Sequence, residues 1–74
     1  MKNKDDLLYE LIFSDNEDFI INISDYMNPI YNYEDFITEI RKIIIISDVC
    51  IIGEGVEVIN KGLVDIIWTI KVRR

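Results

Sequence analysis

Hydrophobic residues recur along this chain with two different periods, and each period predicts a different kind of element. In residues 5–13, leucine and isoleucine follow the i, i+1, i+4, i+5 spacing of one helical face. Asn3 is a candidate N-cap for this helix, and Asp5 and Asp6 would lie favourably at the positive end of its dipole. The alternative is a strand in which every second residue of the same stretch points to one side. We predict the helix.

The next segment changes to the period of a strand. Residues 14–18 are polar and predict a turn, and residues 18–27 then alternate between apolar and polar side chains. Phe19 and Ile21 fall on the same face, so a half-buried strand is expected. We expect it to end at Pro29, because proline has no N–H to donate to a neighbouring strand.

Residues 32–44 show the clearest helical period. Apolar residues occupy positions i, i+1, i+4, i+7 and i+8 from Phe36, and Asn32 is a candidate N-cap. The apolar stripe ends inside the run of four isoleucines at 43–46, whose last two members lie off it. We therefore expect a helix end that is buried on more than one side. A strand that begins near Ile43 is the alternative, since β-branched residues lose side-chain freedom in helices.

The last part of the chain predicts a β-hairpin of residues 49–59 and 63–72. Its loop places Gly62 where a left-handed residue is needed. Gly53 and Gly55 predict a bulge or bend in the first of these two strands.

The order helix, strand, helix, strand, strand in 74 residues predicts one domain, residues 1–74, of the α+β class. We expect a small, mainly antiparallel sheet, made of one strand and the C-terminal β-hairpin, with one or two helices packed on one face. Trp68 lies on the apolar face of its strand and is expected in the core. A chain of this size buries only about 60% of its unfolded surface. Since half of the residues are hydrophobic, the surplus is expected either to pack efficiently in a monomer or to be covered in a homodimer or by a partner.

Charge is distributed unevenly between the two halves of the chain. Residues 1–39 carry ten acids and two lysines, a charge of −8, whereas residues 40–74 carry four acids and six bases, a charge of +2. The first half should repel nucleic acid and anionic lipid and attract a basic surface. No apolar run reaches the ~18 residues of a membrane span. We therefore expect a protein partner with a basic surface, no direct contact with nucleic acid, and no membrane contact.

Candidate chemistry is sparse. The chain has one cysteine and no histidine, so it cannot assemble a tetrahedral thiolate and imidazole metal site, and Cys50 has no imidazole to activate it. Its apolar neighbours Val49 and Ile51 predict a buried structural thiol. Capping and solubility account for the paired carboxylates, and a solvated chain end accounts for the basic residues 71–74. We expect no enzyme, no catalytic residue, no metal and no cofactor.

Acids mixed with tyrosines suit protein recognition, because tyrosine buries a large area at a low cost in entropy. Covering the edge of a thin core is the alternative role for these tyrosines. The candidate partner-binding residues are Asp15, Glu17, Asp18, Asp25, Tyr26, Tyr31, Tyr33, Glu34 and Asp35.

These observations predict a non-enzymatic, acidic protein-binding module. We expect an inhibitor that docks on the basic nucleic-acid-binding surface of a target enzyme by charge complementarity. The residue set, rich in Ile and Asn and without Ala, is similar to that of AT-rich genomes and indicates a phage or mobile element. The alternative is a small structural or regulatory domain that self-associates through an isoleucine-rich interface. The single cysteine and the absence of a signal-peptide pattern predict a cytoplasmic location.

Overall fold

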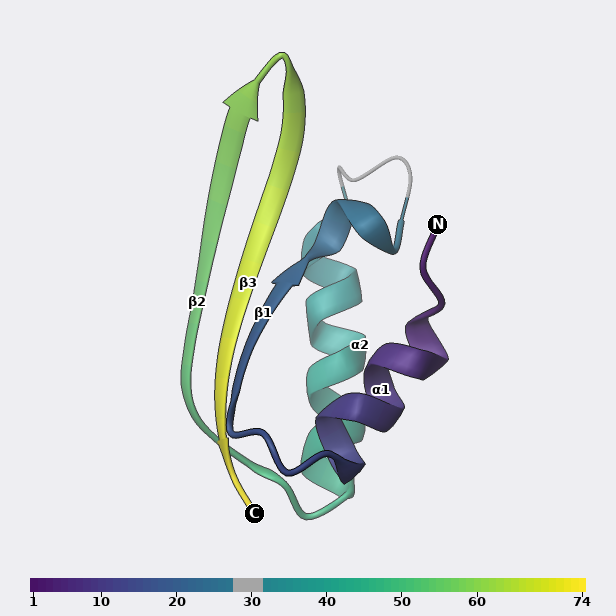
Figure 1. The fold of residues 1–74 in the computed structure, drawn as a ribbon, viewed down its shortest axis with the longest axis vertical. Helices are drawn as coiled ribbons and strands as arrows, with labels where there is room; N and C mark the ends of the chain where they lie inside the picture. Colours follow the sequence, from purple (N-terminus) through teal and green to yellow (C-terminus); the bar gives the residue numbers. More distant parts are fainter. Residues whose placement is uncertain (28–31) are drawn as a thin grey trace.

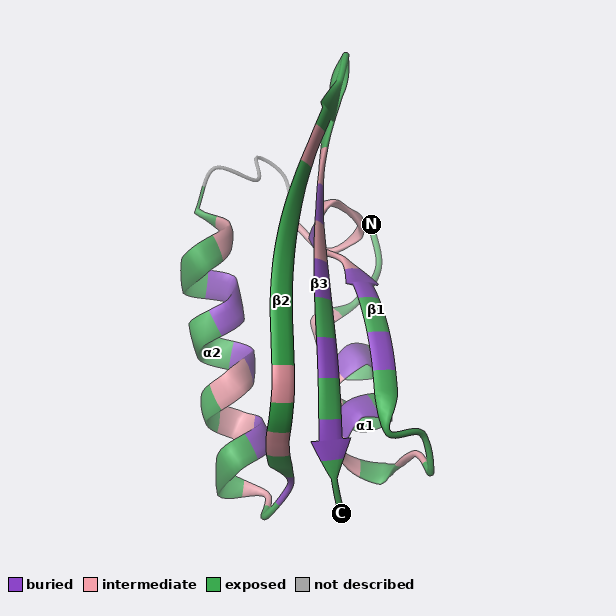
Figure 2. Ribbon diagram, turned by 90° about the vertical axis from the view of Figure 1, so that its left-hand side faces the viewer, coloured by how far each residue is buried: buried purple, intermediate pink, exposed green. Residues whose placement is uncertain are grey.

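The computed structural model describes residues 1–27 and 32–74 and confirms the α+β class (Figure 1). The elements are α1 (Lys4–Phe13), β1 (Asp18–Asn22), the 3-10 helix η1 (Ile23–Asp25), α2 (Tyr33–Ile46), β2 (Cys50–Lys61) and β3 (Leu63–Arg73). Both α-helices lie on one face of the sheet, as predicted, and Figure 2 shows the sheet from the face without a helix.

The sheet is antiparallel, with strand order β1-β3-β2, so the C-terminal strand lies in the centre. Trp68 of β3 is paired with Ile21 of β1 on one side and with Val56 of β2 on the other. It is fully buried, which confirms its predicted place in the core. Among residues 1–27 and 32–74, the other buried side chains are all apolar and come from α1, α2, η1, β1, β3 and the residue before β2: Leu7, Leu11, Phe19, Ile21, Ile23, Phe36, Ile37, Ile40, Ile44, Val49, Ile66, Ile70 and Val72.

Helix α1 confirms the helical reading of residues 5–13. The side chain of Asn3 accepts a hydrogen bond from the Asp5 N–H at 2.8 Å, which is the predicted N-cap. At the other end, the guanidinium of Arg74 donates to the carbonyl oxygens of Leu11 and Ile12 at 2.7 and 2.6 Å. The prediction of a freely solvated chain end is therefore wrong for Arg74, because a cation is stabilised beside the unpaired carbonyls of a helix C-terminus.

Strand β1 is shorter than predicted. It ends at Asn22, whose side-chain oxygen accepts a hydrogen bond from the Ser24 N–H at 3.1 Å and so starts η1. The Asn22 amide also donates to Asp65 on β3 at 3.2 Å. These local bonds compete with further strand pairing. Pro29, which was expected to end the strand, lies outside the described residues.

Helix α2 contains the whole isoleucine run and ends at Ile46. Beyond the cap, Asp48 adopts a left-handed φ of 64°, while the N–H groups of Asp48 and Val49 donate to the carbonyls of Ile45 and Ile44 at 3.2 and 3.3 Å. This hydrogen-bond pattern is a Schellman motif. The expected strand alternative near residue 43 is therefore wrong.

Two further predictions about α2 are also wrong. Asn32 makes no side-chain capping bond; only its backbone carbonyl accepts from the Asp35 N–H, at 3.1 Å. The end of the helix is not buried on more than one side, because Ile45 and Ile46 are 58% and 80% exposed. Nothing in the described residues covers the side of α2 that carries them.

The hairpin matches its prediction closely. Gly62 has a φ of 88° at the turn, and the register shifts between Ile51 and Gly53, so Ile52 is the bulged residue. Cys50, however, is exposed, which contradicts the expected buried thiol. It is paired with Arg73 and shares its outward side, because side-chain direction alternates along a strand regardless of how apolar the neighbours are.

Candidate protein-binding surfaces

The residues predicted to bind a partner fall into two groups at opposite ends of the helical layer. One group lies in the connection from α1 to β1, near the end of the molecule that holds the C-terminus (Figure 1): Asp15, Glu17 and Asp18. The other lies around η1 and the start of α2: Asp25, Tyr26, Tyr33, Glu34 and Asp35. Tyr31 lies outside the described residues. The structure therefore does not bring the predicted residues together into one continuous face.

The two described tyrosines of the second group are partly buried and pack against the core. The ring of Tyr26 lies 6.0 Å from the ring of Phe36. Burial raises the pKa of Tyr26 above its usual value, and nearby carboxylates such as Glu10 raise it further, while Lys2 opposes the rise. These contacts support the alternative in which such tyrosines cover the edge of a thin core.

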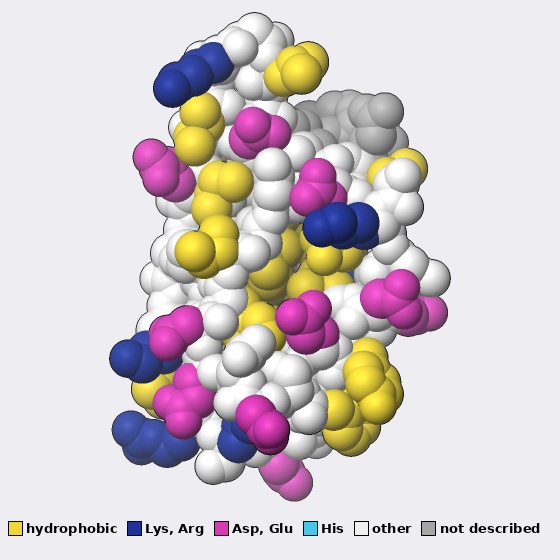
Figure 3. Space-filling model, in the orientation of Figure 1, with side chains coloured by type: hydrophobic (Ala, Val, Ile, Leu, Met, Phe, Trp, Pro, Cys, Tyr) yellow, Lys and Arg dark blue, Asp and Glu magenta, His cyan; other side chains and the backbone are white. Residues whose placement is uncertain are grey.

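A different surface combines acids and aromatic rings, on the outer side of α1. The rings of Tyr9 and Phe13 are 4.9 Å apart, and the two residues are 68% and 67% exposed. Three exposed carboxylates surround this pair. We call the five residues the α1 acidic–aromatic face: Asp5, Asp6, Tyr9, Glu10 and Phe13. Figure 3 shows a hydrophobic patch over the lower part of α1 with acidic side chains beside it.

The helical period places these residues together. Asp5, Tyr9 and Phe13 form one row at spacing i, i+4, and Asp6 and Glu10 form the neighbouring row. Within residues 1–27 and 32–74, the ion pairs join Lys2 to Asp25, Lys4 to Glu39 and Arg41 to Glu54. None of them involves a carboxylate of the face, so its negative charge is not neutralised by the protein's own cations.

A second surface lies where α2 meets β2. Figure 2 shows α2 to the side of β2, beyond the edge of the sheet. Between them runs a groove of about 570 Å³, mostly apolar. Its lining residues are Arg41, Ile45, Asp48, Val49, Cys50, Ile51 and Glu54. We call it the α2–β2 groove.

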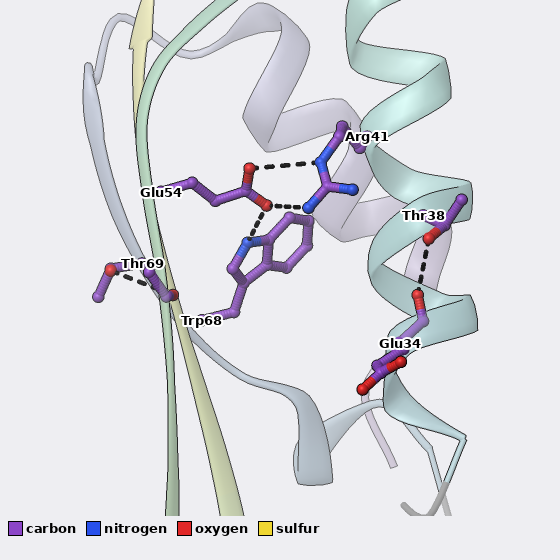
Figure 4. Close-up of polar contacts among 7 residues, drawn as sticks. Glu34, Thr38, Arg41, Glu54, Trp68 and Thr69 are labelled. Carbon is purple, nitrogen blue, oxygen red and sulfur yellow. Dashed lines mark hydrogen bonds and ion pairs between the residues drawn. The ribbon is translucent and has the colours of Figure 1, made fainter.

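One polar cluster spans the groove and ties α2 to the sheet (Figure 4). A single carboxylate oxygen of Glu54 accepts from the Trp68 Nε1–H at 2.9 Å and from the Arg41 guanidinium at 2.5 Å. A second bond runs from Arg41 Nε to the other oxygen at 3.3 Å. The cluster satisfies the N–H of a fully buried indole, which explains a charged residue on the helix-facing side of β2.

Across the described ranges 1–27 and 32–74, no group of three or more cysteine, aspartate and glutamate side chains is placed to hold a metal ion. Cys50 lines the groove beside Asp48 and Glu54, and the chain has no histidine to act as its base. What both surfaces offer is exposed apolar area beside charge, which suits binding.

None of the helices in residues 1–27 and 32–74 has the length and apolar character needed to cross a membrane. Comparisons of the chain with protein-family models, with curated proteins and with solved structures find no match.

Proposed function

We propose that this protein is a non-enzymatic protein-binding module whose α1 acidic–aromatic face docks on a basic surface of a protein partner. The observation that carries this proposal is the exposed Tyr9–Phe13 pair, surrounded by three carboxylates that have no cation of their own among the described residues. The net charge of −6 adds a long-range attraction to the same kind of partner.

The two parts of the face have different physical roles. Carboxylates raise the rate of association with a basic partner and exclude acidic competitors. Aromatic rings supply apolar area, and an arginine or lysine placed over an exposed ring gains about 0.5–1 kcal/mol. Tyr9 and Phe13 are therefore expected to dominate the lifetime of the complex, and the carboxylates its rate of formation.

Helix α1 alone is too short for a stable interface. Its ten residues span about 15 Å, whereas a typical interface buries about 800 Å² on each partner. The chain continues from α1 directly into three exposed acids of the predicted site, which extend the negative surface beyond Phe13: Asp15, Glu17 and Asp18. The acids at the start of α2 are too far along the molecule to belong to the same contact.

A contact of this kind gives a route to inhibition. A negative face that covers the basic nucleic-acid-binding surface of an enzyme competes directly with nucleic acid for that surface. We propose the cytoplasm as the place where this inhibition occurs. By analogy with the composition of AT-rich genomes, we also propose a phage or mobile element as the source of the protein.

The test compares two charge-matched double variants as bait in an extract of the source organism. D6N/E10Q removes two charges from the α1 acidic–aromatic face, and E34Q/D35N removes two charges from the start of α2, away from that face and from β2. Mass spectrometry should show a basic protein whose capture falls about tenfold with D6N/E10Q, a loss of about 1.4 kcal/mol, and is retained with E34Q/D35N.

Raised salt and added DNA should each displace this protein. Capture that is equal for both double variants, or that does not change with salt, would overturn the proposal.

A further inference from the structure

The outer edge of β2 is a long unpaired strand edge. Among residues 1–27 and 32–74, β2 is paired with β3 alone, so the edge that faces away from β3 has no strand beside it. β2 contains twelve residues, and β1 at the other edge of the sheet contains only five. A free edge of this length presents a row of N–H and C=O groups that can pair with another strand.

Helix α2 overhangs this same edge. The groove beneath it, lined by Ile45 from the helix and Ile51 from the strand, is where a further strand of the sheet would lie. Ile45 is 58% exposed there, because nothing in the described residues fills the space in front of it. The position of α2 thus suits a sheet with one more strand than this chain provides.

The end of the hairpin that carries the turn has exposed apolar residues with no helix packed against them. Figure 1 shows β2 and β3 extending past the start of α2, with neither α1 nor α2 against them. Val56 and Val58 are paired with the buried residues Trp68 and Ile66 and so face the helical side, yet they are 46% and 53% exposed. Val64, near the start of β3 beside the turn, is 38% exposed. Within residues 1–27 and 32–74, each chain therefore leaves the groove at one end of β2 unfilled and the apolar hairpin end at the other uncovered.

We propose that a second copy of this chain fills the α2–β2 groove and covers the exposed hairpin end. Two β2 strands pair antiparallel about a twofold axis near Val56 and form a continuous six-stranded sheet. In that dimer the hairpin end of each copy lies in the α2–β2 groove of the other, and its Val58 packs beside Ile45. A twofold interface must be self-complementary, and this one is, because the groove and the hairpin end lie on opposite sides of the axis.

The register follows from charge and from the bulge. With Val56 opposite Val56 of the second copy, Glu57 lies opposite Gly55, which leaves room for its side chain. A shift that centred the axis on Glu57 would place two like charges opposite each other, which is unfavourable. Because Ile52 is bulged, the proposed register brings Cys50 opposite Lys61 of the second copy.

The size of this contact suits a stable dimer. Paired residues of β2 would span about 37 Å at about 3.4 Å per residue, and the molecule measures 37 × 21 × 19 Å. The side of the molecule along β2 therefore has an outline of roughly 700 Å², which is large enough to hold a contact of the standard size, about 800 Å² of accessible surface per partner. In Figure 2, α1 lies away from β2, so the dimer leaves both α1 acidic–aromatic faces free and makes the protein bivalent.

The first test is sedimentation of the full chain over a range of concentrations. Wild type should form dimers. I45D and V58D each place two charges in the symmetric interface, so each should raise the dissociation constant of the dimer at least tenfold. Both variants should retain the circular dichroism of a folded chain. The matched control is I20D, because Ile20 is 80% exposed on the opposite edge strand. It should dimerise as wild type does. A wild type that stays monomeric at every concentration overturns the proposal and leaves the edge to a strand of another protein.

The second test reads the register and does not depend on destabilising variants. K61C should form two intermolecular disulfides with Cys50 under a mild oxidant, and I20C should form none with it. Wild type should not cross-link, because its two Cys50 thiols lie at opposite ends of the interface. A wild-type Cys50–Cys50 cross-link, or K61C that joins only to itself, would refute the antiparallel pairing.

Discussion

Removing the carboxylate of Glu54 should cost more stability than removing the cation that pairs with it. E54A leaves the Nε1–H of Trp68 without its acceptor, and the indole is fully buried. An orphaned buried donor costs about 1–3 kcal/mol. The Arg41–Glu54 ion pair adds little, because its side chains are 38% and 24% exposed, and such pairs contribute about 0–1 kcal/mol. We expect E54A to lower the free energy of unfolding by about 2 kcal/mol.

Two further variants separate the hydrogen bond from the ion pair. E54Q retains an oxygen that can accept from the indole and loses only the charge, and R41Q removes the charge from the other side. Both should lower the free energy of unfolding by no more than about 1 kcal/mol. Urea titration followed by Trp68 fluorescence measures all three, and thermal unfolding should show a drop of about 10 °C for E54A in a chain of this length.

The ranking of the variants is the decisive result. If E54A is no less stable than E54Q, the indole N–H finds another partner, such as water in the α2–β2 groove, and the reasoning is refuted. If R41Q is as destabilised as E54A, the ion pair holds α2 to the sheet more strongly than its exposure implies.

Two other predictions follow from backbone and burial. G62A should lower the free energy of unfolding by about 1–2 kcal/mol, because Gly62 has a φ of 88°. D48G should leave that free energy unchanged or raise it, because glycine adopts the left-handed φ of 64° without strain. Chemical denaturation measures both variants, and a D48G variant that is destabilised as G62A is would contradict this reasoning. Tyr26 holds its proton more tightly in the folded state than in the unfolded state, so stability should fall as pH rises through and above the usual tyrosine pKa of 10.0. Y26F should lose less stability than wild type over the same alkaline range. Identical profiles would show that the pKa of Tyr26 is not raised by folding.

The sequence predicts most of the helices and strands, because the spacing of apolar residues within a short stretch determines each of them. The helical period of residues 5–13, with Asn3 as its cap, and the alternation around Trp68 are both visible within ten residues of sequence. The failures concern contacts that local sequence does not contain. Arg74 caps a helix that lies about sixty residues before it, and no local pattern predicts that contact.

Apolar neighbours in the sequence do not by themselves predict a buried side chain. Ile45 and Ile46 were correctly placed off the apolar stripe of their helix, but β2 does not extend over them. Cys50 has apolar neighbours on both sides, yet strand alternation turns it outward. Ile45 and Cys50 both line the α2–β2 groove beside the free edge of β2, and no local pattern shows which strand lies at the edge of a sheet.

None of the residues of the α1 acidic–aromatic face is among the predicted partner-binding residues, although the spacing that forms the face is present in the sequence. Its row of Asp5, Tyr9 and Phe13 follows the i, i+4 spacing on the side of the helix away from Leu7 and Leu11. The prediction favours the tyrosines nearer to Pro29, because three of them cluster in one short stretch among Asp25, Glu34 and Asp35. Exposed aromatic residues on the polar side of an amphipathic helix would have been the better signal.

The most direct test of the proposed binding face is a two-dimensional NMR titration of the labelled protein with a short arginine-rich peptide as a defined basic probe. We predict that amide shifts concentrate in residues 5–18 and that D6N/E10Q reduces them, while E34Q/D35N leaves them unchanged. Shifts that spread evenly over the chain, or that concentrate at Glu34 and Asp35, would contradict the assignment of α1 as the docking face.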